Sequence, residues 1–173
     1  MDRLHDFGKR HGTRPIAHID EVTRYIEAGS VVFGIEPRQL NSMVLTAHKT
    51  KNAEEYENLE AEIARVADLD FDLSGVSIHV FDAAERNEYL RFDAFPEDPH
   101  YHYVTPNSGH TLVAFDDVAE PDFVGWVLER LATQLGPMLE HAGGGGLVAT
   151  LDQATIDAAV VQVRAIVDEL AAQ

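Results

Sequence analysis

Apolar side chains recur every three to four residues in several stretches of this 173-residue chain, which is the period of a helix with one buried face. In the first stretch Ile16, Ile19 and Ile26 share one side, and Gly29 follows as a stop. The same reasoning predicts helices over residues 15–28, from 37 onward, and over 52–67, 123–141 and 152–172. Pro137 is expected to kink or end the fourth helix, because proline removes a helical hydrogen bond.

Between the third and fourth of these helices the pattern changes to the alternation of β-strands. Strands are predicted over residues 76–81, 88–95, 100–104 and 111–115, each bounded by Asp, Asn, Pro or Gly. A further apolar run, Val31–Ile35, fits either a strand or a buried connection. We therefore expect an α+β fold with a four-stranded antiparallel meander in the middle of the chain. N-terminal and C-terminal helices should cover one sheet face and leave the other for solvent or a partner.

The whole chain, residues 1–173, is expected to form a single domain, because its length suits one hydrophobic core. Residues 1–14 are expected to be mobile, as chain termini often are. Gly143–Gly146 is expected to act as a flexible joint before the C-terminal helix. These glycines are not followed by the Lys-Ser/Thr of a phosphate loop, so the sequence does not indicate a nucleotide site there.

Charge and composition narrow the classes of function. Thirty acidic residues against thirteen basic ones give a formal charge of −17, which disfavours binding to nucleic acid or to an anionic membrane surface. The chain has no cysteine, so disulfides and thiolate metal sites are excluded. It also shows no signal-peptide pattern and no run of about twenty apolar residues, so we expect a cytoplasmic protein.

Ionisable residues alternate with apolar ones on the middle strands. If Leu90 and Phe92 face the core, then Arg91 and Asp93 share the opposite face. Matching apolar residues across the first two strands brings His79 to that same face.

Matching Phe92 and Ala94 with the tyrosines of the next strand requires a connection of even length. This register predicts Asp93 opposite His102 and Phe95 opposite His100, whereas an odd connection would set Asp93 beside Tyr101. Opposed residues lie about 5 Å apart, so imidazole and carboxylate groups could meet.

The predicted cluster allows two kinds of site. His79, His100, His102 and Asp93 are candidate ligands for zinc or another divalent first-row metal. Alternatively, Asp93 could orient His102 as a general base while Arg91 stabilises an anionic substrate, which makes these three the candidate catalytic residues. A solvated outer sheet face would carry the same residue types without any site.

Three segments also carry a resemblance: Val76–Phe81, Glu88–Asp93 and Pro99–Tyr103. Together they resemble an uncharacterised family of bacterial proteins, over about residues 74–143, and this implies one continuous domain without naming an activity. The Arg-x-Asp strand followed by a His-rich strand more remotely resembles small toxins of the TumE type. Because the dense run of adjacent histidines in those toxins is missing, we do not carry their nuclease activity over.

Three functional hypotheses follow. The first is a cytoplasmic homo-oligomer that binds a small molecule or a protein partner, since the amphipathic C-terminal helix could be exchanged between copies. The second is a metal-assisted or His/Asp general-base hydrolase that uses the middle-strand cluster. The third is a toxin-like protein that acts on RNA.

Overall fold

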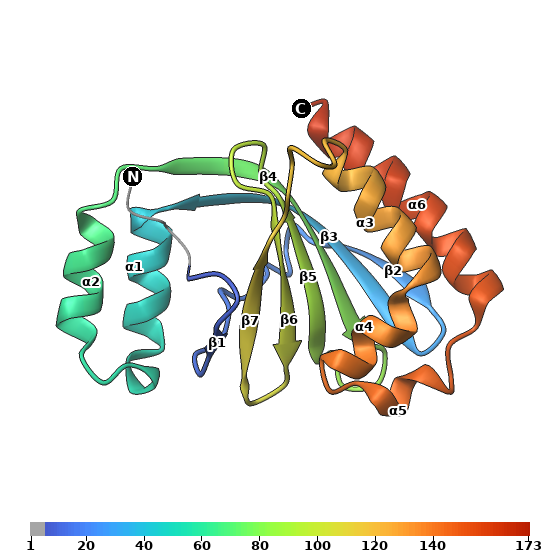
Figure 1. The fold of residues 1–173 in the computed structure, drawn as a ribbon, viewed down its shortest axis with the longest axis horizontal. Coiled ribbons are helices and arrows are strands. Elements are labelled where there is room, and N and C mark those ends of the chain that lie inside the picture. The colour runs from blue at the N-terminus through green and yellow to red at the C-terminus, as the bar shows by residue number, and fades with distance from the viewer. Residues whose placement is uncertain (1–5) are drawn as a thin grey trace.

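The computed structural model describes residues 6–173, which form one seven-stranded antiparallel sheet with helices on both sides (Figure 1). The strands are β1 (Arg10–His11), β2 (Arg24–Ala28), β3 (Val31–Asn41), β4 (Asp72–Asp82), β5 (Glu88–Ala94), β6 (His100–Thr105) and β7 (Gly109–Ala114). They lie in the order β1-β7-β6-β5-β4-β3-β2. The helices are α1 (Ser42–Lys51), α2 (Leu59–Ala67), α3 (Phe123–Thr133), α4 (Leu135–His141), α5 (Gly145–Val148) and α6 (Gln153–Ala171), with a short 3₁₀ turn at Ala53–Glu55.

The expectation of a four-stranded meander is wrong because the sheet is larger. The four middle strands are present as β4 to β7 and are neighbours, but β3 and β2 extend the sheet at one edge and β1 at the other. The apolar run at Val31–Ile35 is a strand, and its pairing with β4 continues as far as Asn41. The α+β class of the fold is as expected.

Residues 15–28 do not form the expected helix. Their last part is β2, and before it the chain is held in a non-helical path by the buried carboxylate of Glu36. That carboxylate accepts hydrogen bonds from the backbone N–H of Ile19 at 2.8 Å and from the hydroxyl of Thr23 at 3.3 Å. Ile19 and Val22 are 54% and 42% exposed, so the apolar period did not mark a core face here.

The helix expected from Pro37 onward is also displaced. Strand β2 pairs with β3 only as far as Ile35, so β3 has a free edge from Glu36 to Asn41. A proline is tolerated there because an edge strand does not need every N–H. Helix α1 begins at Ser42, where the side chain of Asn41 caps it by accepting the N–H of Val44.

The later helices follow the sequence pattern more closely. The helix expected over residues 123–141 is divided into α3 and α4 at Gln134, because Pro137 has no N–H to donate to the carbonyl of Thr133. The short helix α5 begins within the glycine joint and extends beyond it, and α6 begins after its cap Asp152. The segment expected to be mobile includes β1 in its described part, and its residues 1–5 lie outside the described residues.

The two faces of the sheet differ in composition. One face is apolar and packs against α3, α4 and α6, with residues such as Ile78, Leu90, Phe92 and Leu131 in a single core cluster. The other face carries the polar residues, and the α1–α2 pair lies on that side (Figure 1). A smaller apolar cluster joins α1 to the sheet around Leu40, Leu73 and Phe95. No helix in the described part of the chain is both long and apolar enough to cross a membrane.

The substitution Gly109→Ala tests the attachment of β1 to the sheet. The φ of Gly109 is +99°, and a Cβ there would lie 1.9 Å from the carbonyl oxygen of His11. We expect Gly109→Ala to lower the free energy of unfolding by about 1–3 kcal/mol in urea denaturation, because the backbone must become strained or β1 must separate. The matched control is Gly146→Ala, since a Cβ at Gly146 meets nothing within 4 Å. Equal stability of the two variants would contradict this account of β1.

Candidate metal centre

The pairing of β5 with β6 differs from the predicted register by two residues. Asp93 lies opposite His100, and Arg91 lies opposite His102. The connection is longer than predicted because it contains Pro96 and Pro99, which cannot donate ladder hydrogen bonds. A shift of two residues keeps every side chain on its predicted face.

Asp93, His100 and His102 converge on the polar face of the sheet. The Oδ2 atom of Asp93 lies 3.0 Å from Nε2 of His102 and 3.3 Å from Nε2 of His100. Each of the three offers one ligand-type atom, and these atoms all lie within 4.8 Å of one another. All three side chains are buried, and the hydroxyl of Ser77 donates a hydrogen bond to Oδ1 of Asp93. We call these three residues the Asp-His-His triad.

The protonation states of the triad follow from burial and from mutual contact. Burial alone would raise the pKa of Asp93, but hydrogen bonds from His100 and His102 hold it well below its usual range. Burial lowers the pKa of His102 to about 3 against the opposing effect of Asp93. For His100 burial also opposes the charged form, but the hydrogen bond and charge of Asp93 prevail and raise its pKa. The triad therefore holds an ionised carboxylate between two imidazoles.

Hydrogen bonds outside the triad orient its rings. Nδ1 of His100 lies 2.8 Å from the carbonyl oxygen of Asp98, so it carries a proton and leaves Nε2 directed at Asp93. A metal-ligating histidine is commonly held in this way by a carbonyl group. Nδ1 of His102 is buried without a hydrogen-bond partner among residues 6–173.

His79, expected as a further metal ligand, lies in a different cluster on the same face. Its Nδ1 is 2.6 Å from Oε1 of Glu88, and its Nε2 is 3.4 Å from Oε1 of Glu36. Glu88 also accepts two hydrogen bonds from Arg91, at 2.9 Å from Nε and 2.8 Å from Nη2. Arg91 is 2% exposed, and Arg38 pairs with Glu36 beside it. We call these five residues the buried charge network.

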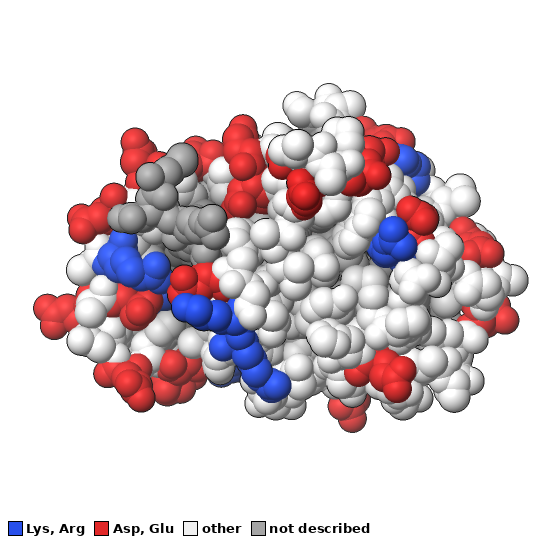
Figure 2. Space-filling model, viewed as in Figure 1, with Lys and Arg blue, Asp and Glu red and all other residues white. Residues whose placement is uncertain are grey.

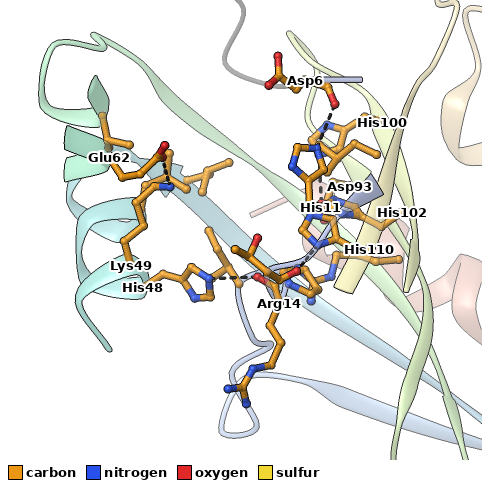
Figure 3. A pocket seen from close by; sticks show the side chains of 18 of the residues that line it. Asp6, His11, Arg14, His48, Lys49, Glu62, Asp93, His100, His102 and His110 are labelled. Atoms are coloured by element: carbon orange, nitrogen blue, oxygen red, sulfur yellow. Dashed lines mark hydrogen bonds and ion pairs between the residues drawn. The ribbon is translucent and has the colours of Figure 1, made fainter. Parts of the chain in front are cut away.

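The triad lies in the wall of a cavity of about 300 Å³ between the sheet and the α1–α2 pair (Figure 3). Among the described residues, five of the nine histidines of the chain line it: His11, His48, His100, His102 and His110. The ring of His110 stands 5.2 Å from the ring of His102, and its Nδ1 lies 2.8 Å from the carbonyl oxygen of Thr13. His48 instead ties α1 to the N-terminal segment through the carbonyl of Arg14.

His48 and His110 line the cavity although neither belongs to the cluster predicted from the middle strands. No local pattern could have placed His11 or His48 in the cavity, because each arrives there through contacts between segments far apart in the chain. His11 reaches it because β1 pairs with β7, and His48 because α1 lies on the polar side of the sheet.

The cavity is richer in basic residues than the rest of the chain. In the described part of the molecule its lining includes five of the thirteen Lys and Arg residues but only three of the thirty Asp and Glu residues. On the face shown in Figure 2, acidic residues are scattered widely, while a run of Lys and Arg atoms crosses the surface over β1. Each of the five basic lining residues is paired with a carboxylate, so the cavity is rich in ion pairs; the pairs are Arg14 with Glu54 and Glu55, Arg38 with Glu36, Lys49 and Arg65 with Glu62, and Arg91 with Glu88.

A family model with the description "Domain of unknown function (DUF7700)" matches residues 25–167. This span runs from β2 into α6 and contains the whole triad. Comparisons with curated proteins and with solved structures found no match. The resemblance to an uncharacterised family is therefore confirmed, over a longer span than residues 74–143, while the resemblance to toxins of the TumE type stays a prediction.

The buried charge network can be tested by removing one carboxylate. We expect Glu88→Ala to cost about 3–5 kcal/mol of unfolding free energy in chemical denaturation, because Arg91 would stay buried without its partner. The control is Glu27→Ala, which breaks the ion pair with Arg86 at the surface and should cost less than about 1 kcal/mol. Similar losses in the two variants would show that the network is solvated rather than buried.

The same network predicts a loss of stability in acid. Burial alone would raise the pKa of Glu36, but the contact with His79 and the charge of Arg38 prevail and lower it to about 2. Because the folded pKa is below the unfolded value, ionised Glu36 stabilises the fold above pH of about 4.5, and this contribution is lost as the pH falls toward 2. We expect Glu36→Gln to flatten the dependence of the unfolding free energy on pH in this window. An unchanged slope in the variant would contradict the assignment.

Proposed function

We propose that this chain, which belongs to the DUF7700 family, is a metal-dependent hydrolase whose divalent first-row metal is bound by Asp93, His100 and His102. The observation that carries the proposal is the convergence of three buried ligand-type side chains on the wall of a cavity. A carboxylate and two imidazoles form a common donor set for catalytic zinc and for non-haem iron.

The spacing of the donor atoms suits a metal of this size. With metal–ligand bonds of about 2.0–2.2 Å, two ligands at angles between 90° and 110° lie about 2.8–3.6 Å apart. Oδ2 of Asp93 stands 3.0 Å and 3.3 Å from the two Nε2 atoms, which falls within this range, and the ligand atoms of the two histidines lie within 4.8 Å of each other. Protons on the imidazoles hold the three groups together when no metal is bound, and a metal would replace them.

Three protein ligands leave coordination positions for water and substrate, which is the arrangement of catalytic rather than structural metal sites. A metal bound there would lower the pKa of a coordinated water. His110 stands beside the triad as a neutral imidazole, because burial lowers its pKa to about 4. Its Nδ1–H donates to the carbonyl of Thr13, so Nε2 carries the lone pair, and the residue lines the cavity next to His102.

The hypothesis of a homo-oligomer that binds a small molecule or a protein partner without chemistry of its own depends on the C-terminal helix. The helix that motivated an exchange between copies, α6, packs its buried residues Ile156, Ala159, Val163 and Val167 into the core of its own chain. This docking favours α6 staying within its own chain, so an oligomer would need another contact. A cavity of about 300 Å³ is at the small end for ligand sites, which favours a small molecule over RNA as the ligand.

Metal binding is tested by calorimetric titration of chelator-treated protein with Zn²⁺, Mn²⁺, Fe²⁺ and Co²⁺. We expect one equivalent of at least one metal to bind, and we expect His102→Gln to weaken binding at least about 10-fold. His79→Gln is the informative control, because His79 lies in the buried charge network and should not alter the stoichiometry. No binding of any of the four metals to the folded wild-type protein would overturn the proposal.

Reactivity is tested on the metal-loaded protein with chromogenic carboxylate esters, phosphate esters and amides. Hydrolysis that a chelator removes and added metal restores supports the hydrolase. A fully loaded protein that hydrolyses none of these classes would be a metal-dependent binding protein instead.

A further inference from the structure

Arg91 has one guanidinium nitrogen that the fold does not use. Nε and Nη2 both donate to Glu88, whereas Nη1 has no hydrogen-bond partner among residues 6–173. In this part of the chain, the side-chain nitrogens and oxygens that are sealed from solvent and make no hydrogen bond are Nε2 of His79, which still contacts Glu36 at 3.4 Å, and Nδ1 of His102. Nη1 of Arg91 is therefore reached from the cavity that Arg91 lines.

Arg91 stands next to the Asp-His-His triad. It lies opposite His102 across the β5–β6 pair, and it is two residues from Asp93 on the same face of β5. Residues two apart on a strand are separated by about 7 Å, so one small group can reach both the triad and the free nitrogen.

The charge of Arg91 affects the pKa values of other groups that line the cavity. Arg38, which lines the same cavity, has its pKa lowered first by burial and then by the charge of Arg91, against the opposing charges of Asp93, Glu36 and Glu88. Burial also lowers the pKa values of His48 and His110, and the charge of Arg91 adds to the effect in each case. Arg38 and Arg91 are each paired with a carboxylate, Glu36 and Glu88, so the unused Nη1 of Arg91, rather than the summed charge of the two groups, offers a place for an anion.

We infer that the cavity binds a small oxyanion, a carboxylate or phosphate group, through Nη1 of Arg91 next to the metal held by the triad. This inference rests on the proposed metal site and names its substrate class. The bidentate contact with Glu88 fixes the guanidinium plane, so the free nitrogen is oriented before a ligand arrives. A cationic N–H donor without an acceptor favours an anion over a cation as the ligand of this part of the cavity.

The test uses the zinc-loaded full chain, titrated calorimetrically with inorganic phosphate and, separately, with malonate at constant ionic strength. We expect at least one of the two anions to bind, and the stronger of them identifies the class. Arg91→Lys keeps a positive charge against Glu88 but removes Nη1, so it should weaken binding at least about 10-fold. Arg65→Lys is the matched control at the rim, where Arg65 pairs with Glu62, and it should change affinity less than about twofold.

A second measurement does not depend on the variants. With Mn²⁺ in place of zinc, an anion bound beside the triad should show strong paramagnetic broadening of its ³¹P or ¹³C resonance. A protein that holds metal but neither binds nor broadens either anion would overturn the inference, and so would equal binding by the Arg91→Lys and Arg65→Lys variants.

Failure of the metal site gives a different result. If no metal binds, the proposed function fails, and the anions are then titrated against the metal-free protein. Binding that Arg91→Lys removes would support Arg91 as the anion site on its own, whereas absence of binding would overturn the inference as well.

Discussion

The structure depends on charge buried on one face of an antiparallel sheet. Arg91 is almost fully enclosed, and an enclosed guanidinium is stable only with a carboxylate fixed against it. Glu88 supplies that carboxylate from the same strand, and His79 joins it to Glu36 on β3. Glu36 also accepts a hydrogen bond from the backbone N–H of Ile19. One network therefore connects the strands β3, β4 and β5 with the N-terminal segment. The buried charge network lies on the same sheet face as the Asp-His-His triad and has no residue in common with it.

The long β3–β4 pair converts this polar face into a cavity. Both strands have eleven residues, and beyond the end of β2 they continue to the helices α1 and α2. A small apolar cluster around Leu40, Leu73 and Phe95 fixes the α1–α2 pair at that end. The space between these helices and the sheet is walled by histidines and cations from segments far apart in the chain (Figure 3). Polar residues that would be solvated on an open sheet are thereby brought together and partly shielded from solvent.

The features of this fold that depend on neighbouring residues in the chain could be predicted from the sequence. The alternation of Leu90 and Phe92 with Arg91 and Asp93 assigns faces within a strand, and matching apolar residues across β4 and β5 gave their observed register. The β5–β6 register was wrong by two residues because strand length near Pro96 is decided by the loop. The extra strands, and the separation of His79 from the triad, depend on long-range pairing that periodicity does not contain. For the same reason the segment before β2, fixed by Glu36, was mistaken for a helix.

The central claim is that Asp93, His100 and His102 hold a metal at the cavity wall. The most direct test is a crystal structure of the zinc-loaded protein with diffraction data collected on both sides of the zinc absorption edge. The account predicts one anomalous peak within about 2.0–2.2 Å of Oδ2 of Asp93 and of one imidazole nitrogen from each histidine. A peak elsewhere, or a loaded crystal with the three side chains still bonded only to one another, would contradict it.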